Sequence, residues 1–113
     1  MENCIFCKIA QKEMGRLVYE DDTVAAFDDL NPQAPVHVLL VPKKHIEKLA
    51  DVKPDEAAMV GHILEVASAI AAERGVAGAG YRVVVNNGRA AGQSVDHLHF
   101  HLLGGRPLGW PPG

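Results

Sequence analysis

The chain lacks the features by which nucleic-acid-binding, exported and membrane proteins are most easily recognised. Its 11 Lys and Arg residues are outnumbered by 14 Asp and Glu, and the formal net charge of −3 excludes a broad basic surface for nucleic acid. No apolar run approaches the roughly 20 residues that span a bilayer. No basic segment followed by an apolar stretch begins the chain, so export is not expected. These absences predict a cytoplasmic protein with neither a membrane nor a nucleic acid as its partner.

Cysteine is also scarce, since Cys4 and Cys7 are the only two in the sequence. In the reducing cytoplasm a disulfide between them is disfavoured. The sequence has no internal repeats, and its 113 residues are near the commonest length of one domain. With 48% hydrophobic and 22% charged residues it has the composition of an ordinary soluble domain. We therefore expect residues 1–113 to form a single domain.

Three histidines alternate with apolar residues in the segment from His97 to Leu103. In a strand, alternate side chains share a face, so three imidazoles would lie opposite Leu98, Phe100 and Leu102. Neighbours on one face are roughly 6.5–7 Å apart, which is too far for all three imidazoles to bind one atom. The spacing suits adjacent roles around one anionic group, or a metal ligand beside a catalytic group. Histidine titrates near neutral pH, binds metals and acts as a nucleophile, so the pattern indicates a functional site.

The rest of the sequence predicts an α+β fold. A short helix is expected over 4–11, and apolar residues recurring every three or four positions predict a long helix over 55–74. Residues 36–41 are almost continuously aliphatic, which is typical of a strand buried on both faces. Strands are expected over 17–20, 23–27, 36–41, 81–86 and 97–103. We expect these five strands to be connected in sequence and to form a mainly antiparallel sheet.

The histidine segment resembles the signature of the histidine triad (HIT) superfamily, in which three histidines alternate with apolar residues. The resemblance extends to Phe27–Pro35, His37, Val41–His45, Val85–Gly88, Gly92–Ser94 and the Trp-Pro-Pro-Gly ending. The Gln-Ser pair before the histidines and this ending are similar to the Hint branch, the purine nucleoside phosphoramidases. The resemblance implies a HIT-like meander of five strands with one long and one short helix. It also implies a homodimer in which two sheets form one continuous sheet.

The same resemblance implies a hydrolase that cleaves the P–N bond of purine nucleoside 5′-phosphoramidates, such as AMP-lysine. His99 would attack phosphorus and form a covalent nucleotidyl-histidine intermediate, a reaction that a neutral imidazole can perform. His101 and His37 would orient it and handle protons, and Ser94 would donate to the leaving group. Two alternatives stay open at this point: hydrolysis of dinucleoside polyphosphates, and a non-enzymatic role as a nucleotide-binding regulatory or scaffold protein.

The resemblance further implies a purine nucleotide site in three parts. Asp29 would accept hydrogen bonds from the ribose hydroxyls, although a carboxylate before Asn-Pro is also typical of a turn. The α-phosphate would be held by Asn86 and by the segment Gly92, Gln93 and Ser94. The base would lie in an apolar slot formed by Ile5, Phe6, Ile9, Phe27 and Leu30, residues that also have the character of ordinary core.

Cys4 and Cys7 form a Cys-x-x-Cys motif, which is half of a zinc site or a redox pair. A closed structural zinc site needs four ligands. Some HIT proteins complete such a site with histidines at the positions of His45 and His97, so the resemblance implies structural zinc. The alternative is a pair of reduced thiols. No organic cofactor is expected.

Overall fold

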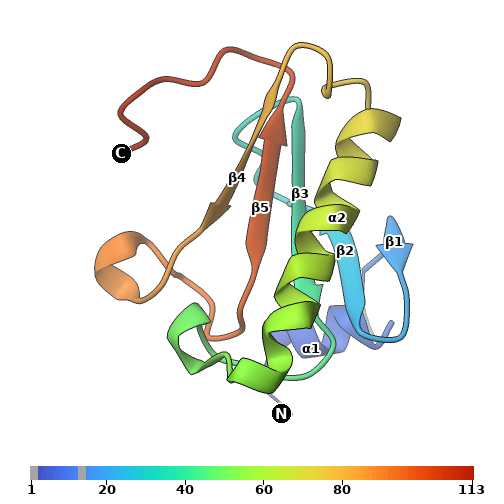
Figure 1. Ribbon diagram of the computed structural model, residues 1–113, viewed down its shortest axis with the longest axis vertical. Helices are drawn as coiled ribbons and strands as arrows, with labels where there is room; N and C mark the ends of the chain where they lie inside the picture. The colour runs from blue at the N-terminus through green and yellow to red at the C-terminus, as the bar shows by residue number, and fades with distance from the viewer. Residues whose placement is uncertain (1–2, 13–14) are drawn as a thin grey trace.

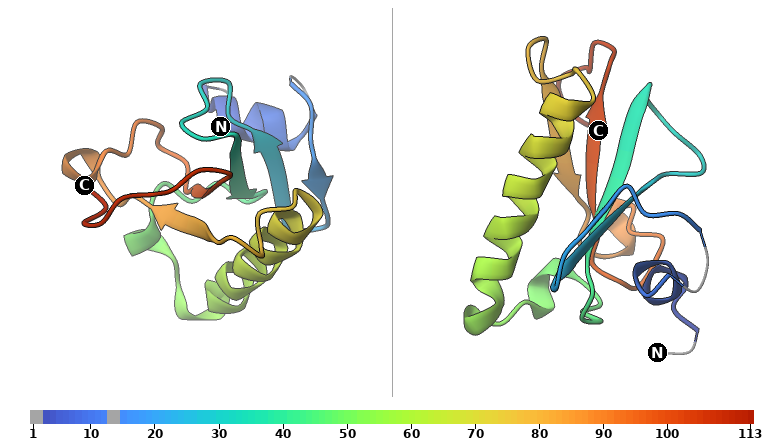
Figure 2. Two further views of the ribbon diagram at one scale, coloured as in Figure 1. Left: turned by 90° about the horizontal axis from the view of Figure 1, so that it is seen from above. Right: turned by 90° about the vertical axis from the view of Figure 1, so that its right-hand side faces the viewer.

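One antiparallel sheet with a helix on each face makes up the molecule (Figures 1 and 2), and the α+β prediction is confirmed. The computed structural model describes residues 3–12 and 15–113. The strands are β1 (Tyr19–Glu20), β2 (Val24–Asp28), β3 (Val36–Pro42), β4 (Tyr81–Val85) and β5 (Phe100–Gly104). The helices are α1 (Ile5–Ala10) and α2 (Ala57–Glu73). Short 3-10 turns lie at Leu49–Asp51, Pro54–Glu56 and Arg89–Ala91. None of the helices in the described ranges is long and apolar enough to cross a membrane.

The order of strands in space departs from their order in sequence at β4. From edge to edge the order is β1-β2-β3-β5-β4, and every neighbouring pair is antiparallel. The prediction of an antiparallel sheet is confirmed, whereas the prediction of a simple meander is wrong. After β3 the chain crosses the sheet through α2, whose 17 residues span about 25 Å, and enters β4 at the far edge. β5 then fills the place between β3 and β4.

The final strand begins at Phe100, three residues later than predicted. The reason is that residues 97 and 98 bond to the end of β3 and to the loop after it instead of to a strand ladder. The Leu98 N–H donates to the Ile46 carbonyl at 2.6 Å, and the His97 Nε2–H donates to the Pro42 carbonyl at 2.9 Å. The alternation of faces nevertheless holds, because Leu98 lies in the core under α2 while the ring of His97 lies near Phe6 of α1.

The sheet separates two hydrophobic cores. The larger lies between the sheet and α2, which contributes Ile63, Val66 and Ile70. The smaller lies between the sheet and α1, where Phe6 packs with residues of β2 and β3. Every residue of β3 is buried, as its continuous aliphatic sequence predicted. The two-sided burial of β3 leaves the α1 face of the sheet as the place where His37 can meet the histidines of the final segment.

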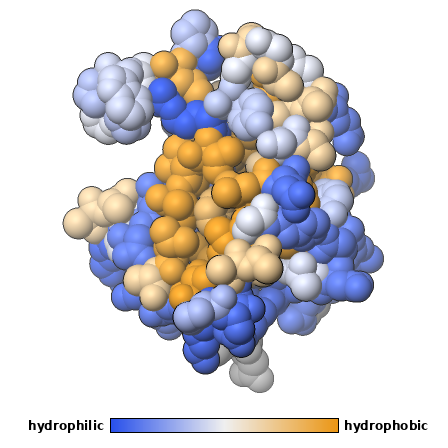
Figure 3. Space-filling view, in the orientation of Figure 1, coloured by the Kyte–Doolittle hydropathy of each residue, from blue (hydrophilic) through white to orange (hydrophobic). Residues whose placement is uncertain are grey.

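β4 forms one edge of the sheet and is less buried than β3 or β5. Its valines are half-buried, and apolar side chains gather on the molecular face over β4 and β5 (Figure 3). Past β5 the chain runs back along this edge, where Arg82 Nη2 donates to the Gly109 carbonyl at 2.8 Å. Trp110 follows and is 82% exposed. The edge strand and the end of the chain therefore form one surface.

Candidate active site and metal centre

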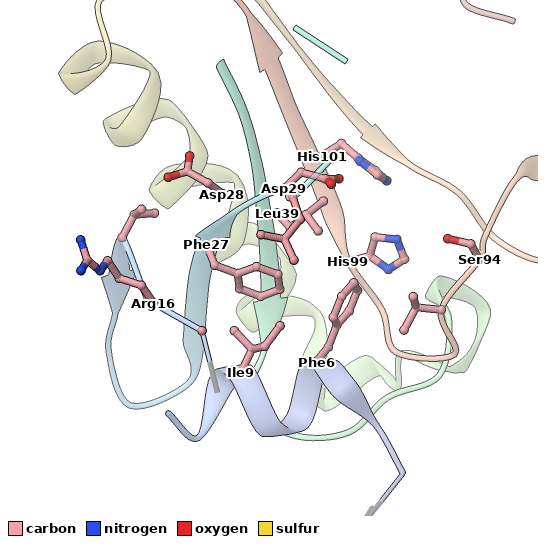
Figure 4. Close-up of a pocket in the computed structure, with 14 residues that line it drawn as sticks. Phe6, Ile9, Arg16, Phe27, Asp28, Asp29, Leu39, Ser94, His99 and His101 are labelled. Carbon is pink, nitrogen blue, oxygen red and sulfur yellow. The ribbon is translucent and has the colours of Figure 1, made fainter. Parts of the chain in front are cut away.

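A hollow of about 400 Å³ opens between α1, the end of β2 and the segment before β5 (Figure 4). One part of it is apolar, where the ring of Phe6 meets the edge of the Phe27 ring with 5.4 Å between centroids. The other part carries imidazole, hydroxyl and carboxylate groups. Of the residues predicted from sequence, those that line the hollow are Phe6, Ile9, Phe27, Asp29, Leu30, Ser94, His99 and His101.

Several lining residues were not found by sequence reasoning. Leu39 lies two positions after His37 on β3, so the period of a strand could have placed it on the same face. Val95 follows Ser94 directly. No local signal pointed to Gly15, Arg16 and Val18, because the segment before β1 comes near the site only in three dimensions. Asp28 lies between two predicted residues, Phe27 and Asp29.

His99 is buried, and its ring has one nitrogen free to react. Its Nδ1–H donates to the His97 carbonyl at 2.7 Å, which assigns the proton to Nδ1 and leaves the lone pair on Nε2. The Phe6 ring packs edge-on against the imidazole, with 5.0 Å between centroids. Figure 4 shows the Ser94 hydroxyl pointing toward this ring across the hollow. The hydrogen bond and the packing hold the imidazole in one orientation.

His37 reaches the hollow through His101. The Gln33 N–H donates to His37 Nδ1 at 3.0 Å, so the His37 proton lies on Nε2, which donates to His101 Nδ1 at 2.9 Å. His101 then carries its own proton on Nε2. Asp29 Oδ2 lies 3.4 Å from His37 Nε2, farther than the nitrogen that receives the proton. The result is a directed chain of hydrogen bonds that ends at the hollow.

His37 and His101, the two histidines joined by this hydrogen bond, are neutral at pH 7. Burial lowers the pKa of His37, although the nearby Asp29 acts in the opposite direction. Burial, together with the neighbouring His99 and His37, lowers the pKa of His101 to about 4. Neutral imidazoles each have one donor and one acceptor, which is what the observed chain of hydrogen bonds requires.

Asp29 is compatible with both roles that the sequence allowed, a turn carboxylate and a group that lines the nucleotide site. Its Oδ1 accepts from the Asn31 N–H at 2.8 Å, which makes it a turn carboxylate, and it also lines the hollow. Asn86 lies next to the loop before Ser94, because its amide nitrogen is 3.8 Å from where a Cβ on Gly92 would lie. Gly92 has φ of +97°, a conformation that favours glycine.

Some predicted nucleotide-binding residues lie outside the lining of the hollow. Asn86, Gly92 and Gln93 precede Ser94 in the sequence and do not line the hollow. The Gln93 side chain is buried among backbone groups. Ile5 is 45% exposed and lines a second hollow, beside Cys4 and Ser94. The structure thus brings the histidines, Ser94, Asp29 and the base slot together, with the predicted phosphate loop at their side.

Cys4, Cys7, His45 and His97 are brought together from three distant segments, and one ligand atom from each lies within 4.8 Å of all the others. Cys4 Sγ is 3.2 Å from His97 Nδ1, and Cys7 Sγ is 3.2 Å from His45 Nδ1 and 3.4 Å from His97 Nδ1. Ligands of a tetrahedral zinc ion lie about 3.5 Å apart, given usual Zn–S and Zn–N lengths. These four residues could therefore hold a metal ion, and their donor set fits zinc.

The protonation of this cluster is compatible with metal binding. The His97 Nε2–H bonds to the Pro42 carbonyl, so its Nδ1 lone pair faces the sulfurs. Burial lowers the pKa of His97 to about 4, which keeps the ring neutral. Burial raises the pKa of Cys7 to about 11, with further contributions from Cys4, so the thiol would release its proton when it bound a metal.

The antiparallel five-stranded sheet with a histidine cluster at its central strands is the arrangement that the histidine triad resemblance implied. The HIT domain family model matches residues 11–108, and the chain belongs to this family. It is 46% identical over 109 residues to the purine nucleoside phosphoramidase of Escherichia coli K12, covering 96% of this chain and 92% of the relative. It is 52% identical over 113 residues to an uncharacterized HIT-like protein of Synechocystis, covering 99% and 98%.

Solved structures agree with this assignment. A HIT family hydrolase from Legionella pneumophila superposes with a TM-score of 0.95 at 48% identity, covering 98% of this chain and all of that one. A histidine triad protein from Clostridium difficile gives a TM-score of 0.93 at 50% identity, covering 96% of both chains. The resemblance predicted from the histidine segment is confirmed over nearly the whole chain.

Proposed function

We propose that this protein is a hydrolase that cleaves the P–N bond of purine nucleoside 5′-phosphoramidates, such as AMP-lysine. The observation that carries the proposal is the state of His99, whose Nε2 lone pair is available because its Nδ1 proton is held by a backbone carbonyl. His99 lines a hollow that has an apolar slot at one end and polar groups at the other. The name of the Escherichia coli relative supports the same reaction.

The reaction has two steps in this proposal. The Nε2 atom of His99 attacks the α-phosphorus, the P–N bond breaks, and the amine departs after it gains a proton. Water then attacks the nucleotidyl-histidine, which releases the nucleoside monophosphate and restores the imidazole. His101 and His37 orient His99 and handle protons, and the Ser94 hydroxyl bonds to the departing nitrogen.

The nucleotide would be bound by groups around this centre. The base would lie in the apolar slot, with Asp29 accepting from the ribose hydroxyls. The Asn86 side-chain amide and the Ser94 end of the loop would stabilise negative charge on the phosphoryl oxygens, because the Gly92 and Gln93 N–H groups already donate to the Arg89 and Gly88 carbonyls. The residues proposed for the base are Ile5, Phe6, Ile9, Phe27 and Leu30, and the loop proposed for the phosphate comprises Asn86, Gly92, Gln93 and Ser94, in which the Gln93 side chain supports the backbone.

We also propose that Cys4, Cys7, His45 and His97 bind a structural zinc ion. Four protein ligands leave no open position for water, so the ion would stabilise the fold and take no part in catalysis. The cluster joins α1, the loop after β3 and the segment before β5. It would therefore fix the helix that carries Phe6 against the segment that carries His99.

The proposed function is tested with a panel of adenosine and guanosine phosphoramidates and dinucleoside polyphosphates, with kcat/KM measured for each. We expect the phosphoramidates to be cleaved with kcat/KM above about 10⁴ M⁻¹s⁻¹, within the usual range for enzymes, and far above the dinucleotides. Preferred cleavage of the dinucleotides would show the alternative hydrolase. Tight nucleotide binding without turnover of any substrate would show a binding protein.

We propose that residues 1–113 form a single domain and that two chains form a homodimer with one continuous sheet. β4 is an edge strand, and within the described residues its outer side has no strand partner. Its half-buried valines give it apolar character, and an unpaired apolar edge is normally covered. Arg82 holds the last residues beside this edge, where its guanidinium lies 5.9 Å from the Trp110 ring centroid.

Sedimentation at micromolar concentration is expected to give the mass of two chains. Removal of residues 109–113 deletes Trp110 but keeps Arg106, which bonds to the Gln33 carbonyl near the active site. We expect this truncation to alter preference among amine leaving groups more than it lowers the melting temperature, because the residues are exposed in one chain. A monomeric full-length protein would contradict the proposed assembly.

A further inference from the structure

The Gln93 side chain is buried and bonds to three separate parts of the backbone. Its Oε1 accepts from the Gly88 N–H at 2.8 Å, and its Nε2 donates to the Glu47 carbonyl at 2.7 Å and the Val95 carbonyl at 3.0 Å. The Gln93 N–H in turn donates to the Gly88 carbonyl at 3.1 Å. Both ends of the amide are therefore engaged within the protein, and the side chain is a brace and not a ligand for nucleotide.

These bonds fix the backbone on both sides of Ser94. Gln93 is anchored before it, and the Val95 carbonyl is anchored after it by the same amide. The loop that follows β3 is the support, since it offers the Glu47 carbonyl to Gln93 and the Ile46 carbonyl to the Leu98 N–H. Ser94, held between the anchored residues, lines the hollow with its hydroxyl toward His99 (Figure 4).

We infer that Gln93 is a positioning residue, which holds the Ser94 hydroxyl where it can bond to the nitrogen of the departing amine. The inference rests on the proposed phosphoramidase function. A displacement of about 1 Å at a reacting centre can cost on the order of 100-fold in rate, so a brace of this kind controls activity without touching the substrate.

A glutamine side chain is needed because the site uses both ends of a neutral amide. The oxygen meets an N–H donor, and the nitrogen meets two carbonyl acceptors. Glutamate would place a carboxylate against the two carbonyls, and methionine would keep the length while losing every hydrogen bond. Gln93→Met is therefore the variant that removes the brace with the least change of shape.

The test is a double-variant cycle between Gln93→Met and Ser94→Ala. Two AMP substrates are compared, one with an alkylamine leaving group and one with p-nitrophenolate, which departs without a proton. Ser94→Ala is expected to lower kcat/KM by about 100-fold for the amine and by about 3-fold or less for the phenolate. Gln93→Met is expected to shift the ratio of the two rates in the same direction. The double variant is expected to match Ser94→Ala alone within about 2-fold.

Additive losses in the double variant, or equal losses on both substrates for Gln93→Met, would overturn the inference. Ile63→Val is the control for lowered stability, because Ile63 is a fully buried residue of α2 on the opposite face of the sheet from the hollow. It is expected to lower the melting temperature while leaving the ratio of the two rates unchanged.

Amide hydrogen exchange gives a readout that does not depend on activity. In Gln93→Met, exchange of residues 88–96 is expected to rise about 10-fold or more, while exchange in α2 stays as in the wild type. Unchanged exchange in residues 88–96 would overturn the inference. If the wild type cleaves neither substrate, the proposed function fails, and the exchange measurement still decides whether Gln93 holds this loop.

Discussion

Replacement of His99 with alanine or asparagine is expected to reduce turnover by about 10⁴-fold or more, as for other covalent nucleophiles. Nucleotide binding should persist within a few-fold, because the apolar slot and Asp29 are separate from the imidazole. Steady-state kinetics with an adenosine phosphoramidate measures the first quantity, and calorimetry with AMP measures the second. Residual activity near the wild-type level would remove His99 from the proposed mechanism.

The covalent step can be observed directly. Mass spectrometry of rapidly quenched wild-type protein is expected to show a nucleoside monophosphate adduct on the peptide that contains His99. His62→Ala serves as the matched control, because His62 is a half-exposed histidine of α2 that bonds to Asp21 far from the hollow. That variant should keep the adduct and the turnover rate.

The second large effect is expected from loss of the metal centre. Freshly purified protein should contain about one zinc ion per chain, and a Cys4→Ser, Cys7→Ser variant should contain none. We expect the double variant to melt more than about 10 °C below the wild type, since a structural zinc site can contribute several kcal/mol to folding. Turnover at a temperature where both proteins are folded should fall only modestly, because His99 is not a ligand.

Serine is the informative replacement at position 4 because it removes the metal ligand while it keeps the cap of α1. The Cys4 sulfur accepts from the Cys7 N–H at 3.3 Å and caps α1, and serine is among the best residues for this role. A loss of stability in Cys4→Ser therefore reports the metal ligand and not the cap. Zinc-free wild-type protein, or a double variant as stable as the wild type, would contradict the zinc site and favour the alternative of two reduced thiols.

The sequence was sufficient to predict the elements and most of the residues that the structure brings together at the candidate site. Strand and helix periods lie within short segments, so the long helix, the buried strand β3 and the two faces of the histidine segment were predicted from local pattern. The four metal-ligand candidates were predicted from residue type and resemblance, and the structure brings them together.

What the sequence could not provide depends on contacts between distant segments. The place of β5 between β3 and β4 follows from pairing, which no single strand encodes. The start of β5 was misplaced because His97 bonds to Pro42, 55 residues away. Gln93 was predicted as part of the phosphate-binding loop, whereas the partners of its side chain on the loop after β3 are visible only in three dimensions.

Because β5 is the last of the five strands of this sheet to be synthesised yet lies inside it, the sheet cannot close early. Until β5 arrives, β3 lacks one neighbour and β4 has none, since β5 is the only strand with which β4 pairs in the described residues. The nascent protein would expose these apolar edges to other chains and depend on long-range pairing for its final step. The same step delivers His99 and His101, so activity should appear together with the completed sheet and in no shorter fragment.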